Sequence, residues 1–110
     1  MSHPTFESGS VVSQTSDLIQ VQPSTIVSRT IIKKQSGTVT LFAFDQGQEL
    51  SEHTAPFDAL VHVLEGTAEV IISGTAHTVT PGESILMPAH APHALRAITA
   101  FKMLLAMVRV

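Results

Sequence analysis

Short apolar segments rich in β-branched residues recur along most of the chain, and residues that favour turns separate them. The segments lie at residues 25–32, 38–44, 59–64, 67–72, 77–79, 84–87 and 101–110. Most of the intervening turns contain a glycine, as in Ser36-Gly37 and Ser73-Gly74, and glycine adopts the positive φ that many tight turns require. Segments this short and evenly spaced are typical of strands in a sandwich or barrel. The sequence therefore predicts an all-β fold.

The last segment, FKMLLAMVRV at 101–110, is ambiguous on composition alone. Leucine, alanine and methionine are strong helix formers. However, Phe101, Met103, Leu105 and Met107 alternate with residues of the other parity, which favours a strand whose two faces are both covered. We predict a strand here.

The length and charge of the chain limit its organisation and its partners. With 110 residues, 44% of them hydrophobic and 14% charged, the chain has the size and composition of one globular domain. Residues 1–16 are rich in Ser, Thr, Gly and Pro and are predicted to form a flexible arm, with the domain spanning residues 17–110. The formal net charge of -3 and the lack of a basic run argue against nucleic acid as a partner.

The absence of cysteine restricts the chemistry that a site can use. Without thiolates, histidine and carboxylate side chains are the plausible ligands for a first-row metal. The chain shows neither the basic-then-apolar order of a signal peptide nor an apolar run near the ~20 residues of a spanning helix. We therefore expect a cytoplasmic protein that has no membrane partner.

Two stretches carry glycine, proline and histidine at regular spacings. In the first, five residues separate Gly47 from His53, and Gly66 lies thirteen positions after His53. In the second, five residues separate Gly82 from Pro88, and His93 follows. These spacings resemble the paired signature motifs of the cupin superfamily, and together they span 47–97.

The resemblance implies a cupin-type double-stranded β-helix, which is a jelly-roll barrel, with a metal site inside it. In the family, a His-x-His pair, a Glu and a later His surround the metal. Here His53 and His93 occupy the first and last of these positions, whereas Ala55 and Ala59 occupy the second His and the Glu positions. His90 occupies a glycine position of the second motif.

Two further residues are candidate ligands if the strand that follows Pro56 is irregular. Asp58 precedes the vacant Glu position and is either a third ligand or a solvent-facing turn residue. His62 has the parity of Asp58, so in a regular strand it faces away from the pocket, where it is available to a dimer interface, but a one-residue slip turns it inward.

Two functions remain open at this point. One is a metal-dependent oxygenase or isomerase acting on or sensing a small organic molecule, with iron, manganese, nickel or zinc on His53 and His93. The other is a binding module with no metal, whose pocket holds a small, largely apolar ligand. The pocket residues that we expect are Ala55, Ala59, Phe44, Val61 and Met87. The apolar composition permits a homodimer, and the resemblance implies one.

Overall fold

The computed structural model describes residues 10–110, and strands form nearly all of its regular structure. A short 3-10 helix, η2 (Thr15–Leu18), precedes the first strand. The strands are β1 (Ile26–Lys34), β2 (Gly37–Phe44), β3 (Glu49–His53), β4 (Phe57–Glu65), β5 (Ala68–Ile72), β6 (Thr75–Val79), β7 (Ser84–Met87), β8 (His93–Ala97) and β9 (Phe101–Arg109). Within the described residues, no helix has the length and apolar character needed to cross a membrane. The all-β prediction is confirmed.

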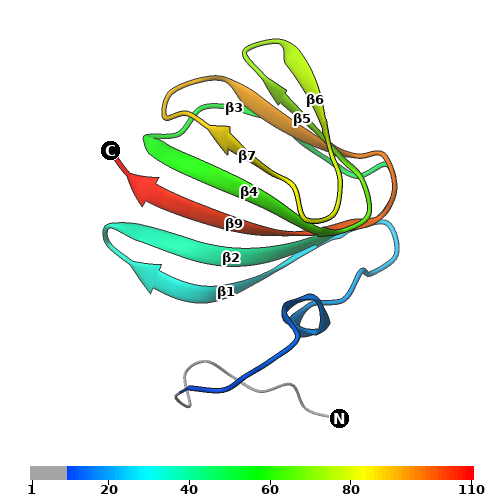
Figure 1. The fold of residues 1–110 in the computed structure, drawn as a ribbon. Coiled ribbons are helices and arrows are strands. Elements are labelled where there is room, and N and C mark those ends of the chain that lie inside the picture. Colours follow the sequence, from blue (N-terminus) through cyan, green and yellow to red (C-terminus); the bar gives the residue numbers. More distant parts are fainter. Residues whose placement is uncertain (1–9) are drawn as a thin grey trace.

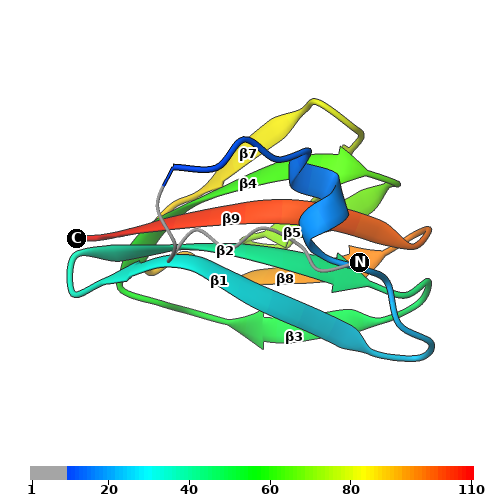
Figure 2. The same cartoon turned by 90° about the horizontal axis from the view of Figure 1, so that it is seen from below.

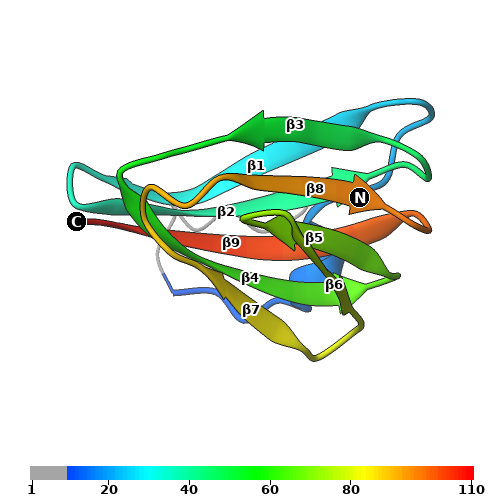
Figure 3. The same ribbon diagram turned by 90° about the horizontal axis from the view of Figure 1, so that it is seen from above.

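The strands form two antiparallel sheets (Figure 1). The five-stranded sheet has the order β1-β2-β9-β4-β7, and the four-stranded sheet has the order β3-β8-β5-β6. The view from above shows the strands of the four-stranded sheet lying over those of the other (Figure 3). Because β9 lies between β2 and β4, and β8 lies between β3 and β5, each sheet brings together segments that are distant in the sequence.

Strand β4 illustrates how the alternation of side chains builds the interior. Ala59, Val61 and Val63 are buried, whereas Asp58 and Leu60 are exposed. Successive side chains of a strand point to opposite faces, so the first three lie between the sheets and the other two lie on the outer face. The interior therefore consists of one parity of each strand.

The strand predicted at 101–110 is confirmed as β9, and both of its faces are covered. Phe101 and Met103 on the inner face and Lys102 on the outer face are all buried. Two observed strands, β3 and β8, lie outside the predicted segments. Four of the five residues of β3 are exposed, so this strand has no apolar alternation to detect, and β8 begins directly after a proline.

A second, smaller core lies on the outer face of the five-stranded sheet. There, Leu18 and Ile19 pack against Leu41 and Ala43. Figure 2 shows η2 crossing the outer side of this sheet near β9 and β2. The segment around η2 thus covers one part of this outer face.

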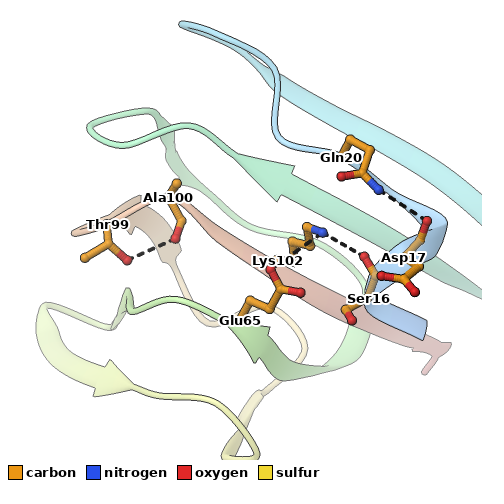
Figure 4. Close-up of polar contacts among 7 residues, drawn as sticks. All are labelled: Ser16, Asp17, Gln20, Glu65, Thr99, Ala100 and Lys102. Carbon is orange, nitrogen blue, oxygen red and sulfur yellow. Dashed lines mark hydrogen bonds and ion pairs between the residues drawn. The ribbon is translucent and has the colours of Figure 1, made fainter. Parts of the chain in front are cut away.

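Polar contacts of Lys102 join η2 to the same sheet (Figure 4). The Nζ of Lys102 donates a hydrogen bond to the carbonyl oxygen of Ser16 at 2.8 Å and lies 3.6 Å from Oε1 of Glu65. Residues 1–9, most of the predicted arm, lie outside the described residues. The boundary between the arm and the domain stays a prediction.

Aromatic rings fill one end of the space between the sheets. The rings of Phe44 and Phe101 stack with centroids 4.5 Å apart, and Phe42 lies 6.2 Å from Phe44. We call this region, defined by these three rings, the aromatic end. Beside it, Gly66 has a φ of 75°, and a Cβ on it would collide with the carbonyl oxygen of Ala100. The chain therefore turns here so closely that only glycine fits.

Candidate functional site

His53 and His93 meet at the opposite end of the space between the sheets. They are paired residues of the adjacent strands β3 and β8. Their Nε2 atoms lie 3.0 Å apart, and their rings meet edge to face with centroids 4.2 Å apart. His93 is buried, with 6% of its surface exposed, whereas His53 is exposed. The pair therefore stands where the interior opens to solvent.

An irregularity in β3 turns His53 inward. Leu50 pairs with Leu95 and His53 pairs with His93, so three residue steps on β3 face two steps on β8. One extra residue on one strand is a β-bulge, and it changes which side chains share a face. Without the bulge, Leu50 and His53 would point to opposite faces, but both now line the same cavity.

Hydrogen bonds to backbone carbonyls fix the orientation of both imidazoles. Nδ1 of His53 lies 2.9 Å from the carbonyl oxygen of Ser51, and Nδ1 of His93 lies 3.1 Å from that of Ala91. A carbonyl oxygen only accepts, so each Nδ1 carries the proton and donates it. In the neutral rings, both Nε2 atoms then present a lone pair to the other at 3.0 Å. A cation between them, either a proton or a metal ion, is what removes this repulsion.

A cavity of about 60 Å³ lies beside the histidine pair, and its wall is largely apolar. The wall is formed by Leu50, His53, Ala55, Phe57, Ala59, Met87, His93, Leu95, Met103, Leu105 and Met107. Three of the expected pocket residues, Ala55, Ala59 and Met87, belong to it. The small side chains at the two vacant motif positions leave part of this space free.

The other two expected pocket residues, Phe44 and Val61, do not line this cavity. Their assignment to the pocket is corrected, because both belong to the packed core. Both face the interior and are fully buried, but Phe44 lies at the aromatic end, where it stacks on Phe101. Met107 lines the cavity but was not among the expected pocket residues. Its parity in β9, which it shares with Met103, is the signal that predicts it.

Asp58 and His62 lie on the outer face of β4, opposite the buried face of Ala59. Oδ1 of Asp58 accepts a hydrogen bond from the backbone N–H of Ala89 at 2.9 Å, and Nδ1 of His62 is 2.7 Å from the hydroxyl oxygen of Ser84. Strand β4 pairs regularly with β7 and β9 through this region. The slip that would turn these two side chains inward is therefore absent from the structure.

His90, His77 and Glu83 are not among the residues that line the cavity. His90 is exposed with a φ of 67°, and His77 is exposed on β6. Oε1 of Glu83 accepts hydrogen bonds from the hydroxyl and the backbone N–H of Thr80. These bonds lower the pKa of Glu83 below its ordinary value of 4.5 because they favour the charged form. Glu83 thus stabilises a turn.

The donors at the pair fit part of a metal coordination shell. Two ligands that lie about 2.1 Å from one metal ion and about 90° apart stand about 3 Å from each other, which matches the 3.0 Å between the Nε2 atoms. Metal-binding histidines commonly donate their other N–H to a carbonyl or carboxylate, as His53 and His93 do. Within residues 10–110, however, no group of three or more His, Cys, Asp or Glu side chains gathers for a metal. Further ligands must therefore be of another kind.

Solved structures share this architecture. A conserved protein of unknown function from Streptococcus pyogenes is 36% identical, with a TM-score of 0.90, over 100% of this chain and 96% of that chain. A cupin superfamily protein from Desulfitobacterium hafniense is 25% identical, with a TM-score of 0.83, over 86% of this chain and 87% of that chain. A cupin 2 conserved barrel domain protein from Leptotrichia buccalis is 37% identical, with a TM-score of 0.83, over 86% of this chain but only 46% of that chain.

The sequence also matches a family model directly. The model describes a cupin domain and matches residues 40–108, which is more than half of the chain. A comparison with curated proteins finds no match. The matched region contains both histidines of the pair and every strand that lines the cavity. The cupin-type fold is therefore confirmed, and the chain belongs to the cupin family.

Proposed function

We propose that this cupin binds a first-row metal ion through Nε2 of His53 and of His93 and presents it to a small organic molecule in the adjacent cavity. The observation that carries the proposal is the pair itself. The two Nε2 atoms lie 3.0 Å apart, and Nδ1 hydrogen bonds to backbone carbonyls hold both rings in this arrangement. Because both imidazole rings are already held in place, binding an ion costs little side-chain conformational entropy.

The size of the cavity limits the organic molecule. Sites for drug-sized ligands typically enclose about 300–1,000 Å³, whereas this cavity measures about 60 Å³. It accepts a small aliphatic group of a few carbon atoms, while a polar group of the same molecule reaches the histidines. Because His53 is exposed and His93 is buried, the molecule would approach past His53.

The chain's own residues orient and shield what binds. The carbonyl oxygens of Ser51 and Ala91 hold the two rings in place, and the apolar wall excludes water from the inner side. A bound metal ion would supply a Lewis acid that polarises an oxygen of the organic molecule. An oxygenase or isomerase would convert the bound molecule, whereas a sensor would release it unchanged. Assaying the identified ligand for turnover by the metal-loaded protein distinguishes these two roles.

Metal titration tests the proposal. Purified protein should bind one equivalent of iron, manganese, nickel, zinc or copper ion, and His53→Ala or His93→Ala should each weaken binding about 10–100-fold or more. His77→Ala, which removes an exposed histidine from β6, serves as the matched control. Equal affinities for all four proteins, or no bound metal in any of them, would contradict the proposal.

The second candidate is a binding module that needs no metal. No carboxylate of the part of the chain that the structure describes lines the cavity, which favours this candidate because iron and manganese sites of this type commonly use one. Fragment screening by NMR in the presence of a strong chelator separates the two candidates. Binding that survives chelation and also survives His53→Ala supports the metal-free module.

We also propose that two copies of the chain associate through the outer face of the five-stranded sheet. One row of paired residues crosses all five strands there and consists of Ile32, Val39, Ala106, Leu60 and Leu86. Leu86, Ile32 and Leu60 are 53%, 49% and 41% exposed. A continuous apolar row of this kind marks an interaction surface more often than scattered exposed residues do.

The oligomeric state tests this association. Light scattering at micromolar concentration should show a dimer, and Leu60→Glu combined with Leu86→Glu should give a monomer with unchanged circular dichroism. Ile98→Glu, at an exposed apolar residue outside the row, is the matched control and should remain dimeric. A monomeric wild-type protein would overturn the proposal.

A further inference from the structure

Every methionine that the structure describes lies in the wall of the cavity. The chain has four methionines. Met1 lies outside the described residues, and Met87, Met103 and Met107 all line the cavity beside the histidine pair. Among residues 10–110, no aspartate or glutamate lines the same wall. The donors that face this space are thus imidazole nitrogens and thioether sulfurs, without a carboxylate.

The strand register places two of these methionines symmetrically. Ala59 of β4 pairs with Met87 of β7 on one side and with Met107 of β9 on the other. Side chains of directly paired residues have Cβ atoms about 4.5–5.5 Å apart, so the side chains of both methionines begin on either side of the small methyl group of Ala59. Met87 is 3% exposed. Met103 pairs with Val63, further toward the aromatic end.

The two histidines lie on the other sheet, across the interior from these methionines. β8 begins with His93 at the cavity end and finishes with Ala97, whose backbone bonds to the turn that follows Phe44 at the aromatic end. Met87, Ala59 and Met107 therefore lie at the same end of the interior as the pair. Sheets that pack face to face are about 10 Å apart, a distance that an imidazole from one sheet and a thioether from the other span together.

We propose that this cavity is a copper(I) site in which His53 and His93 share the ion with the thioether sulfurs of Met87 and Met107. The inference rests on the proposed metal binding by the histidine pair and adds the identity of the ion and of its remaining ligands. Thioether sulfur is a soft ligand that selects copper(I), whereas manganese and iron favour carboxylates.

The apolar wall of the cavity favours an ion of low charge. The cost of moving an ion from water into an apolar interior rises with the square of its charge, and no acidic side chain in the wall offsets that charge. A monovalent ion therefore meets a much smaller penalty here than a divalent ion does. Methionine also has three rotatable bonds and a polarisable sulfur, so both thioethers can adjust their positions to the ion.

Competition for copper(I) under anaerobic conditions tests the proposal. With a chromophoric copper(I) chelator as competitor, the Met87→Leu, Met107→Leu double variant should bind copper(I) about 10–100-fold more weakly than the wild type. Its affinity for zinc ion should change by less than about twofold, because the imidazoles that would hold zinc are intact. Met103→Leu is the matched control and should resemble the wild type, since leucine and methionine exchange with little disturbance of a core.

The variants separate the failure of this inference from the failure of metal binding itself. If His53→Ala weakens binding of both ions but the double leucine variant does not weaken copper(I) binding, the thioether assignment is overturned and the histidine site survives. If His53→Ala changes neither affinity, both proposals are overturned. A weaker copper(I) affinity in Met103→Leu alone would overturn the choice of methionines.

X-ray absorption of the wild type keeps the inference testable even if the variants fold poorly. Copper(I)-loaded protein should show sulfur scatterers in the first shell together with nitrogen. In protein prepared with selenomethionine, a copper–selenium path should replace the copper–sulfur path. A first shell of nitrogen and oxygen alone would overturn the proposal.

Discussion

The two ends of the interior share strand β9 but contain different side chains. At the aromatic end, Phe44 and Phe101 stack at 4.5 Å and are fully buried. At the end that holds the histidine pair, β9 presents Met107 and β4 presents Ala59, and a cavity of about 60 Å³ remains. Rigid rings fill space in one geometry, whereas methionine and alanine leave room or adapt.

This difference separates stability from function between the two ends of the interior. Close packing at the aromatic end means that a lost methylene is felt directly in the free energy of unfolding. Side chains at the cavity end make fewer packing contacts because the cavity lies between them. This end also contains the groups that are available to bind an ion or an organic molecule. Substitutions at matched positions of the two ends should therefore have different consequences.

The largest expected effect is at the aromatic end. Phe101→Ala should reduce the free energy of unfolding by about 3–5 kcal/mol, because it removes a buried ring and leaves a cavity. Urea denaturation followed by circular dichroism measures this loss, with Phe101→Leu as the milder control. A loss below about 1.5 kcal/mol would show that this end is no better packed than the other.

The next effect concerns the turn that borders the aromatic end. Gly66→Ala should lower the free energy of unfolding by about 2–3 kcal/mol. The φ of 75° disfavours alanine, and the added Cβ would collide with the carbonyl oxygen of Ala100. Gly74→Ala is the control, since Gly74 also has a positive φ but no atom lies within 4 Å of the position of its Cβ. Equal costs at the two glycines would rule out a role for the close contact.

A pair of alanines compares the two ends directly. Ala68→Val should lower the free energy of unfolding by about 1–3 kcal/mol through overpacking, because Ala68 is fully buried and pairs with Ala97. Ala59→Val adds the same atoms at the cavity wall and should change the free energy of unfolding by less than about 1 kcal/mol. Thermal and urea denaturation of both variants provide the comparison. The reverse order would contradict the description of the cavity.

The smallest effect is a pH dependence at the turn between β6 and β7. Hydrogen bonds from Thr80 lower the pKa of Glu83 in the folded protein. A lowered folded-state pKa adds stability above the unfolded pKa, and that stability is lost as the pH falls through the folded pKa. On acidification below about pH 4.5, the urea midpoint of Glu83→Gln should therefore fall less than that of the wild type. Thr80→Val removes the hydroxyl donor but keeps the backbone N–H of residue 80, so its loss of stability on acidification should lie between those of Glu83→Gln and the wild type. A wild-type-like profile in Glu83→Gln would contradict the assignment.

The sequence predicts the strands whose inner residues are apolar, and it assigns β9 correctly because its alternation outweighs the helix preference of leucine and methionine. It does not predict β3, whose residues are mostly exposed. The bulge that turns His53 toward His93 adds one residue to one strand, and nothing in the local composition marks it. The resemblance to the cupin motifs predicts that His53 and His93 share a site, but the residue pattern alone does not, because their meeting depends on the register of β3 and β8.

The position of β9 in the middle of the five-stranded sheet has a consequence for how the chain folds. Its two partners, β2 and β4, come much earlier in the sequence, so the sheet closes only after a long loop has been ordered. Contacts of this high sequence separation slow folding, and until they form, β2 and β4 expose open edges that can pair with other chains. The strand that carries Met107 into the site thus also determines when the nascent protein is protected from aggregation.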